Sequence, residues 1–311
     1  MYEKYEEEFL TSGRATELDT YRTLFGKLED YGVFIGDWEN ENLDEFMQIL
    51  GSSSVNSVNK YLNFIREFYR FVCGKEGIEL KDIKLSKDLK SYIDLDALLS
   101  ITINESHYKM LRDLLLISAG YNTYNYRDAC LLVLAWTGCS NEEIKYLNKN
   151  NVEFFAEYNI PKCKLWLSKR ILVLDDAEDI EIIKQTINES RYFMNESGNK
   201  SEHFIDLKSS PALIRGVSTR ESNFDYVSNP GEILSRVLNR IGVLSGTNID
   251  LNQLTLESIS RSRKISLFMQ GANIDDVKNL FTKETSSDLY WLSQISNLIQ
   301  RRLKQAQNKN L

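Results

Sequence analysis

The residue types in this chain that could carry out chemistry are few and scattered. The two histidines, His107 and His203, are distant from each other and from the four cysteines. A zinc site needs several nitrogen or sulfur ligands together, and acid–base catalysis most often uses histidine, so neither kind of site has an evident source. We therefore expect no metal and no cofactor, and we expect His203, in the apolar run His203-Phe-Ile-Asp, to lie in the core.

The cysteines give no sign of a redox or metal motif. Cys73, Cys130, Cys139 and Cys163 form no C-x-x-C pair, and a chain of 311 residues can be stable without disulfides. We interpret them as reduced, buried thiols of a cytoplasmic protein. The acidic start MYEKYEEEFL lacks the order of a signal peptide, and the longest apolar run, Cys130–Trp136, is too short to span a bilayer. Secretion and membrane insertion are not expected.

One row of polar residues has the spacing of a helix face. Within SSSVNSVNKYLNFIREFYRFVCGK, asparagine and arginine recur at intervals of 4, 3 and 4 residues, opposite an apolar side. Such a row can follow phosphates or reach base edges, because asparagine pairs with adenine and arginine with guanine. It can equally be a solvated helix face. The row consists of Asn59, Asn63, Arg66 and Arg70.

A second polar face is expected on a helix over 255–270. At about 100° per residue, Glu257, Ser260, Arg261 and Lys264 fall within an arc of about 100° that could meet a DNA backbone. The alternative is an ordinary ion pair between Glu257 and Arg261 on an exposed helix, which contributes about 0.3–0.5 kcal/mol.

A mainly α-helical chain must position these residues. Three- and four-residue apolar spacing predicts the helices, and only three prolines interrupt the chain. Short β-branched or aromatic runs, Val152–Phe155, Lys164–Leu167 and Ile171–Leu174, predict a small antiparallel sheet. Helices are predicted over 17–33, 43–50, from the serines at 52–54 to Gly74, over 94–102, 105–119 and 127–136, from Ser140, and over 178–197, 230–242, 255–270, 273–281 and 288–306.

The charge distribution limits how a polyanion could bind. A net charge of −7 argues against an indiscriminate polyanion binder, because nucleic-acid affinity comes largely from neutralising phosphates. Residues 1–50 carry 13 acidic and 4 basic side chains, whereas residues 260–311 carry 4 acidic and 9 basic ones. Basic surface is therefore expected to be local.

Three passages of the chain carry a recognisable pattern. Ser54–Phe71, a predicted amphipathic helix, resembles the last helix of a known DNA-clamping domain. Arg127–Ile144 resembles R-D-x-A-L-x-L-x-x-x-T-G-x-R-x-x-E-[LI], and Leu254–Leu280 resembles H-x-L-R-H-T-x-A-T-x-L-x-x-x-G-x-[DN]-[IL]-x-x-[IV]-x-x-L-L-G-H. Over roughly residues 17–300 the chain thus resembles the tyrosine recombinase (phage integrase) family. The resemblance implies a two-domain clamp: a helical core-binding (SAM-like) domain over 1–80, a linker over 81–95 and a catalytic-like domain over 96–311.

The residues that hold the scissile phosphate in that family are replaced here. By the resemblance, the first arginine falls on Ser140, while the acid Glu143 remains and forms an S-x-x-E capping box with it. The H-x-x-R pair falls on Glu257 and Ser260, and the later histidine or tryptophan falls on Lys283. Each lost cationic donor typically costs about 100-fold or more in rate. We therefore expect that the chain is not an enzyme.

The remaining catalytic positions of the family have counterparts of the right type. Lys169 could stand for the lysine that protonates the leaving oxygen, with Lys164 or Arg170 as alternatives, and Tyr290 lies near the position of the nucleophile. The apolar neighbours of Tyr290 make burial the simpler expectation for it.

The resemblance implies double-stranded DNA as the partner. We expect a sequence-specific DNA-binding protein, a transcriptional repressor of a phage or mobile element on an inactive recombinase scaffold, with no membrane association. The alternatives are an active recombinase with Tyr290 as nucleophile, and a protein regulator of an integrase without DNA affinity. The expected DNA contacts are Asn59, Asn63, Arg66, Arg70, Lys169, Arg170, Arg261 and Lys264.

The basic C-terminal helix is the candidate for contacts between copies of the chain. Members of the family exchange their C-terminal segments between protomers, so the resemblance implies a homo-oligomer through this helix. Arg301, Arg302 and Lys304 are expected to contact DNA or a neighbouring subunit.

Overall fold

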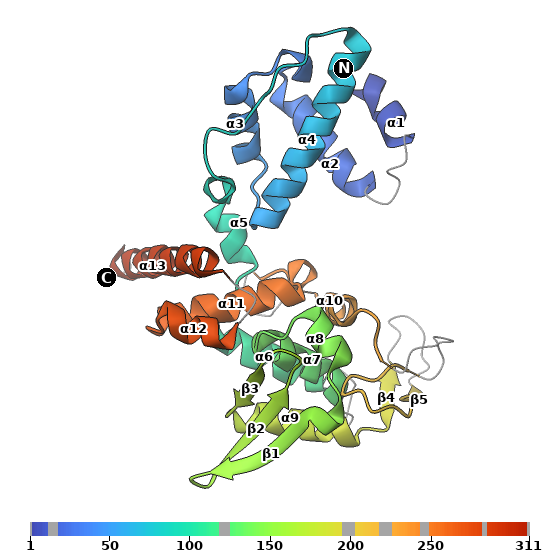
Figure 1. Cartoon of the computed structure of the whole chain (residues 1–311), viewed down its shortest axis with the longest axis vertical. Coiled ribbons are helices and arrows are strands. Elements are labelled where there is room, and N and C mark those ends of the chain that lie inside the picture. The colour runs from blue at the N-terminus through green and yellow to red at the C-terminus, as the bar shows by residue number, and fades with distance from the viewer. Residues whose placement is uncertain are drawn as a thin grey trace. The chain divides into compact units, whose positions relative to one another are not determined.

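The described chain divides into two compact units, Met1–Ser100 and Ile101–Leu311. The structure, a computed structural model, describes residues 2–11, 18–117, 125–194, 203–217, 226–242, 249–281 and 285–309. Both units are mainly helical, and the small antiparallel sheet belongs to the second (Figure 1). The predicted fold class, mainly α with a small antiparallel sheet, is confirmed. Within those ranges, every helix is too short or too polar to cross a membrane.

The first unit is built around one long helix, α4 (Val55–Glu76). The side chain of Ser54 caps its start by accepting a hydrogen bond from the backbone N–H of Ser57 at 3.1 Å. Gly77 ends it with φ +65°, three residues beyond the predicted end at Gly74. The other helices of this unit are α1 (Glu3–Thr11), α2 (Leu18–Tyr31), α3 (Asn40–Ile49) and α5 (Leu95–Ser100), with short 3₁₀ turns at Ile35–Asp37 and Leu89–Tyr92.

The apolar side of α4 forms the core of the first unit. The predicted core positions Val58, Leu62, Ile65, Tyr69 and Val72 are all buried. The buried side is wider than predicted, because α1, which the sequence analysis did not predict, covers α4 with an additional aromatic layer. In that layer, rings of α1 and α2 pack edge-on or stacked against rings of α4, namely Phe9, Tyr21, Phe25, Phe64 and Phe68.

Residues 81–95, the predicted linker, lie along the first unit. Ile83 and Tyr92 are buried in its core, and Leu85, Leu89 and Ile93 pack against it. The Tyr92 hydroxyl also donates a hydrogen bond to Asp44 on α3. How the chain separates into domains in solution stays a prediction.

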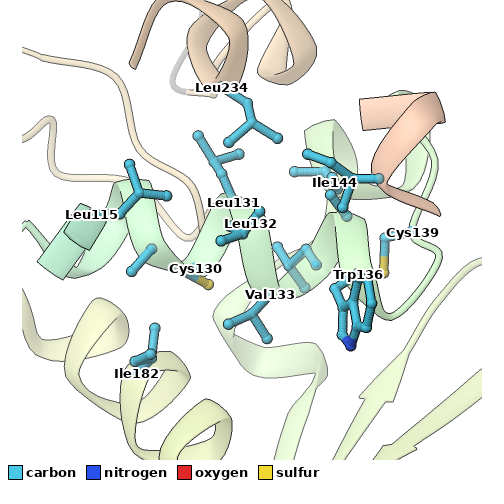
Figure 2. Packing of buried hydrophobic residues seen from close by; sticks show 14 of the residues in the cluster. Leu115, Cys130, Leu131, Leu132, Val133, Trp136, Cys139, Ile144, Ile182 and Leu234 are labelled. Atoms are coloured by element: carbon cyan, nitrogen blue, oxygen red, sulfur yellow. The ribbon is translucent and has the colours of Figure 1, made fainter. Parts of the chain in front are cut away.

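The second unit is centred on α7 (Tyr126–Trp136). Every residue of α7 from Arg127 to Trp136 is buried, as predicted for a helix that is apolar nearly all round. Figure 2 shows Leu131, Leu132 and Val133 of this helix pointing in different directions among side chains of its neighbours. Against it pack α6 (Glu105–Ile117), α9 (Ala177–Asn188), α10 (Pro230–Ile241) and α11 (Leu256–Met269). The other helices of this unit are α8 (Asn141–Tyr146), α12 (Ile274–Leu280) and α13 (Ser286–Lys309), with short 3₁₀ turns at Lys149–Asn151 and Leu251–Gln253.

The predicted three-stranded sheet is present. Strands β1 (Val152–Glu157), β2 (Ile160–Trp166) and β3 (Ile171–Leu174) pair antiparallel in that order. On one face Cys163, Leu165, Leu172 and Leu174 are buried in the core of the second unit, and the opposite face is largely exposed. The loop between β2 and β3 places Arg170 beside the turn that follows α7, where it donates to the carbonyl oxygen of Gly138.

A second, two-stranded sheet was missed. The sequence pattern predicted one helix over 178–197, whereas α9 ends at Asn188, and β4 (Arg191–Met194) pairs antiparallel with β5 (His203–Asp206). The physical reason is a long-range contact. Asn125, just before α7, accepts a hydrogen bond from the backbone N–H of Phe193 and donates one to its carbonyl, both at 3.0 Å.

Candidate nucleic-acid interface

The predicted asparagine–arginine row lies on the solvent side of α4. Asn59, Asn63 and Arg70 are exposed, and Arg66 is half-buried. Arg66 and Arg70 form no ion pair with any other described residue, whereas nearby Lys84 is paired with Asp82 at 2.6 Å. The two guanidinium groups are therefore available to an anion.

A concavity of about 260 Å³ lies beside Arg66 and Arg70. The pKa of Asp82 in its wall is lowered, chiefly by the hydrogen bond from Lys84 and further by the charges of Arg66 and Arg70. The lining carries three cationic side chains, Arg66, Arg70 and Lys81, against the one carboxylate of Asp82. We call this concavity the α4 notch; it is lined by Arg66, Tyr69, Arg70, Leu80, Lys81, Asp82 and Ile83.

A larger cavity, of about 610 Å³, lies in the second unit. It brings together residues of the turn after α7, the loop before β3 and the N-terminal turns of α8, α10 and α11. Positions singled out in the sequence line it, namely Ser140, Glu143, Arg170, Glu257, Ser260 and Lys264. We call it the central cavity; its other lining residues are Gly138, Cys139, Asn141, Asn229, Gly231, Glu232, Ser235, Thr255, Leu256 and Phe281.

Helix caps fix two walls of the central cavity. The predicted capping box is present, because the Ser140 hydroxyl accepts from the backbone N–H of Glu143 at 3.3 Å and the Glu143 carboxylate accepts from that of Ser140 at 2.8 Å. Thr255 caps α11 in the same way, accepting from the backbone N–H of Ser258 at 3.1 Å. Both helices therefore begin at the cavity.

Arg170 forms hydrogen bonds with three segments that surround the central cavity. Its side chain is 6% exposed, and Nε and Nη2 donate to the two carboxylate oxygens of Glu143, each at 3.0 Å. It also donates to the carbonyl oxygen of Gly138 at 2.7 Å and to that of Leu280 at the end of α12. Burial alone would raise the pKa of Glu143, but the hydrogen bonds from Ser140 and Arg170 outweigh it and lower that pKa.

Lys264 and Phe281 close the cavity beside Gly138. Lys264 is 5% exposed, and its Nζ lies 5.0 Å from the centre of the Phe281 ring, a cation–π contact. Gly138 has φ +85°, and a Cβ atom there would come within 2.1 Å of Phe281. Glycine is thus required both by the backbone and by the close approach of the ring.

The charges that line the central cavity do not favour a phosphate. Glu143, Glu232 and Glu257 provide three carboxylates against two cations, Arg170 and Lys264. Both cations already have partners inside the protein. Attraction to a DNA backbone in this unit must therefore come largely from basic residues outside the lining.

Two such residues were predicted. Lys169 is exposed in the loop between β2 and β3, and no described residue forms an ion pair with it. Arg261 is half-buried on α11; burial lowers its pKa, and the charge of Glu257 acts in the opposite direction. The assignment of either residue as a DNA contact stays a prediction.

Tyr290 corrects one expectation. We expected it to be buried, but its side chain is 58% exposed. The reason is the rotation of α13, which turns Leu289 and Leu292 into the protein and Tyr290 away from it. Its hydroxyl is therefore accessible to solvent.

Several predicted residues lie partly or wholly outside the described structure. Lys283 is one of them, and the side chains of Arg302 and Lys304 are others, whereas Arg301 is exposed on α13. His203 begins β5, but its side chain is not among those described, so the expectation of a core histidine is untested. The four cysteines are free and buried, as predicted.

The sequence analysis missed an amide chain beside the central cavity. The Asn141 side chain accepts from the backbone N–H of Gly231 at 2.9 Å and donates to Asn229 Oδ1 at 3.3 Å, joining α8 to the start of α10. Asn229 immediately before Pro230 was an available signal, because asparagine followed by proline at the first helical position is a typical helix start.

Comparisons with known proteins find similarity only among solved structures. No known protein family and no curated protein matches the chain. A post-cleavage complex of the XerH site-specific recombinase with difH DNA shares 14% identity over 98% of this chain and 82% of that one, with a TM-score of 0.47. The XerA recombinase shares 14% identity over 94% and 92% of the two chains, with a TM-score of 0.41.

A third similar structure is the Tn1549 transposon integrase in complex with circular intermediate DNA. It shares 14% identity over 92% of this chain and 93% of that chain, with a TM-score of 0.43. At these TM-scores, the similarities supply no argument about the roles of individual residues in this chain.

The comparisons nevertheless correct the expectation that the chain is not an enzyme. The similar structures are recombinases and an integrase, and those of XerH are pre-cleavage and post-cleavage complexes. The expectation that the chain is not an enzyme depended on matching its residues to the positions of the family's phosphate-holding residues. Those residues count as replaced only where that match is correct. We therefore do not retain this expectation.

Proposed function

We propose that this protein binds double-stranded DNA sequence-selectively and regulates transcription, as a repressor within a phage or mobile element. The observation that carries the proposal is the exposed face of α4, where Arg66 and Arg70 lie beside the α4 notch without an ion pair to any described residue. The recombinase-like motifs in the sequence support the same partner.

The face of α4 has the dimensions of a DNA-reading surface. From Asn59 to Arg70 the helix spans about 16 Å at 1.5 Å per residue, close to half a turn of the duplex. Asparagine and arginine are the side chains that form paired hydrogen bonds with adenine and guanine in the major groove. This face can therefore read bases while neighbouring lysines meet phosphates.

The lysines around the α4 notch have acidic partners that a phosphate can replace. Lys81 is bonded to Glu39 and Lys84 to Asp82, all four on the surface. Exposed pairs of this kind contribute little to stability, so exchanging a carboxylate for a DNA phosphate costs little. The local positive charge also accounts for DNA binding by a chain whose net charge is −7.

The more specific part of the proposal is that the protein regulates transcription by remaining bound to its DNA site. Groove and backbone contacts position a protein on DNA without any chemical step. In its size the chain also resembles the integrase-like master repressor of SPβ-type temperate phages. A repressor needs only that its site overlap a promoter.

A genomic selection tests the proposal. The protein is incubated with fragments of its source genome, recovered, and the bound DNA is sequenced and examined for covalent attachment. We expect a small set of enriched fragments that contain promoters. Recovery of no fragment would contradict DNA binding and favour a protein regulator. Covalent attachment lost in Tyr290→Phe would assign strand cleavage to the chain.

A further inference from the structure

A third cavity, of about 210 Å³, lies in the second unit on the other side of α10 from the central cavity. It is formed by the start of α7, β4, residues 216–217 and 226–229, and one face of α10. Asn229 and Glu232 line both cavities, so the same helix forms a wall of each. We call it the arginine cavity, because Arg127, Arg236 and Arg240 line it.

The arginine cavity is built to hold negative charge. Its lining carries three guanidinium groups against one carboxylate, Glu232, which is paired with Arg236 at 2.8 Å on the exposed side of α10. Asp128, paired with Arg127 at 3.1 Å, adds a second carboxylate, so one positive charge remains in excess. Arg240, one helical turn further along, forms no ion pair with any described residue. Four-residue spacing places Arg236 and Arg240 on the same face of the helix.

Arg127 is held in place by Asp128 and Tyr192. The side chain of Arg127 is 6% exposed, and its Nε and Nη2 donate to Asp128 at 3.2 and 3.1 Å. The Cζ atom of its guanidinium group lies 3.8 Å from the ring centre of Tyr192, whose hydroxyl donates to the same aspartate at 2.7 Å. Nη1 donates to the carbonyl oxygen of Arg215 at 3.4 Å.

This arrangement leaves donors of Arg127 for a ligand. A guanidinium group has five N–H donors, and the hydrogen bonds to described residues use three of them. A buried, pre-oriented guanidinium with spare donors is the kind of group that binds phosphate oxygens in pairs. Ser228 and Asn229 add neutral hydrogen-bonding groups to the wall.

We propose that the arginine cavity is a binding site for the phosphate groups of a small soluble ligand, held by Arg127 and Arg240 with Arg236 at the rim. The cavity is large enough for two linked phosphate groups, and Tyr192 and Tyr226 give it aromatic walls. The cavity belongs to the second unit and the proposed DNA-binding face of α4 to the first, so the proposal stands or falls independently of DNA binding at α4.

Calorimetric titration of the full chain with inorganic pyrophosphate at constant ionic strength tests the proposal. We expect saturable binding to the wild type and a loss of affinity of about tenfold or more in Arg240→Gln, because one charge-assisted contact is removed. Arg191→Gln is the matched control, since Arg191 is an exposed arginine on β4 outside the cavity. It should bind pyrophosphate as the wild type does.

A second titration distinguishes a small soluble ligand from the phosphates of DNA as the source of the bound groups. The same variants are titrated with a duplex of unrelated sequence at the same ionic strength. If Arg240→Gln weakens duplex binding while the wild type does not bind pyrophosphate, the cavity is a DNA contact and the proposal is wrong. Equal pyrophosphate affinity in the wild type and Arg240→Gln would also overturn it.

Discussion

At the scale of single residues, Arg170 is the side chain on which the central cavity depends. It joins the start of α8, the turn at Gly138 and the end of α12 through one buried guanidinium group. Removing one partner of a buried ion pair leaves the other charge uncompensated. Arg170 therefore has a structural task in the free protein, whether or not it also meets DNA.

We predict that Arg170→Ala lowers the free energy of unfolding by about 3–5 kcal/mol, because the Glu143 carboxylate and two carbonyl groups lose their donor. Urea denaturation followed by circular dichroism measures the change. Lys169→Ala is the control, because the side chain of Lys169 is next to Arg170 in the sequence but exposed. This substitution should change the free energy of unfolding by less than about 0.5 kcal/mol. Equal effects of the two substitutions would show that the ion pair is unimportant.

Arg66 and Tyr290 separate the binding of DNA from chemistry on it. We predict that Arg66→Glu weakens affinity for a selected DNA fragment about 10- to 100-fold, because it turns an attraction to phosphate into a repulsion. Tyr290→Phe should leave that affinity nearly unchanged, since it removes only an exposed hydroxyl. Fluorescence anisotropy measures both. An Arg66→Glu variant that binds as tightly as the wild type would remove α4 from the interface.

At the scale of the elements, α7 begins on an unusual cap. Glu189, from the end of α9, accepts hydrogen bonds from the backbone N–H groups of Tyr126 and Arg127, both at 3.0 Å. Burial raises the pKa of the Glu189 carboxyl to about 7, although those hydrogen bonds and the charge of Arg127 act in the opposite direction. The central helix is thus held by a group that titrates near neutral pH.

We predict that stability falls as the pH rises from about 5 to 8. The folded protein binds the Glu189 proton more tightly than the unfolded chain, so its stabilising contribution is complete below the ordinary glutamate pKa and is lost as the pH passes about 7. The loss should be smaller in Glu189→Gln, which does not titrate, and unchanged in Glu181→Gln, an exposed residue of α9. Thermal unfolding at several pH values measures it. The same pH dependence in all three proteins would contradict this role.

The elements show which parts of the fold can be predicted from sequence. The periodic patterns of α4 and α7 were interpreted correctly, because their apolar positions are set by neighbours within the same helix. The strands β4 and β5 were missed because β4 is held by hydrogen bonds between Phe193 and Asn125, which lies 68 residues earlier in the chain. The same holds for α1, whose pattern is short and whose burial depends on α4.

The central cavity was predictable in part. The motif resemblance placed Ser140, Glu257 and Ser260 at corresponding positions, and the structure brings them to one cavity. It did not indicate that Arg170 would pair with Glu143, which lies 27 residues earlier, or reach Leu280, 110 residues later. Such contacts depend on tertiary packing, which one sequence does not show.

At the scale of the whole molecule, the two compact units each carry basic residues proposed to contact DNA. Neither Arg66 with Arg70 nor Lys169 with Arg261 makes a large surface alone. Linking two weak sites raises the effective concentration of the second once the first has bound. Both units are therefore expected to be needed for tight binding.

We predict that the full chain binds its selected fragment about 100-fold or more tightly than either the fragment 1–100 or the fragment 101–311. Circular dichroism establishes beforehand that each fragment is helical. An equimolar mixture of the two fragments is the control, because it contains the same residues without the covalent link. A single fragment with the affinity of the full chain would show that the other unit adds nothing to the interface.

The central claim is that a protein with a net charge of −7 binds particular DNA through local positive surfaces. The most direct measurement is the affinity for the selected fragment and for a scrambled duplex of equal length at several salt concentrations. Between about 50 and 200 mM salt, a contact with several phosphates should weaken at least about 100-fold. We predict that decline for both duplexes, with the selected fragment bound more tightly throughout. Equal affinity for both duplexes, or an affinity that salt does not change, would contradict the account.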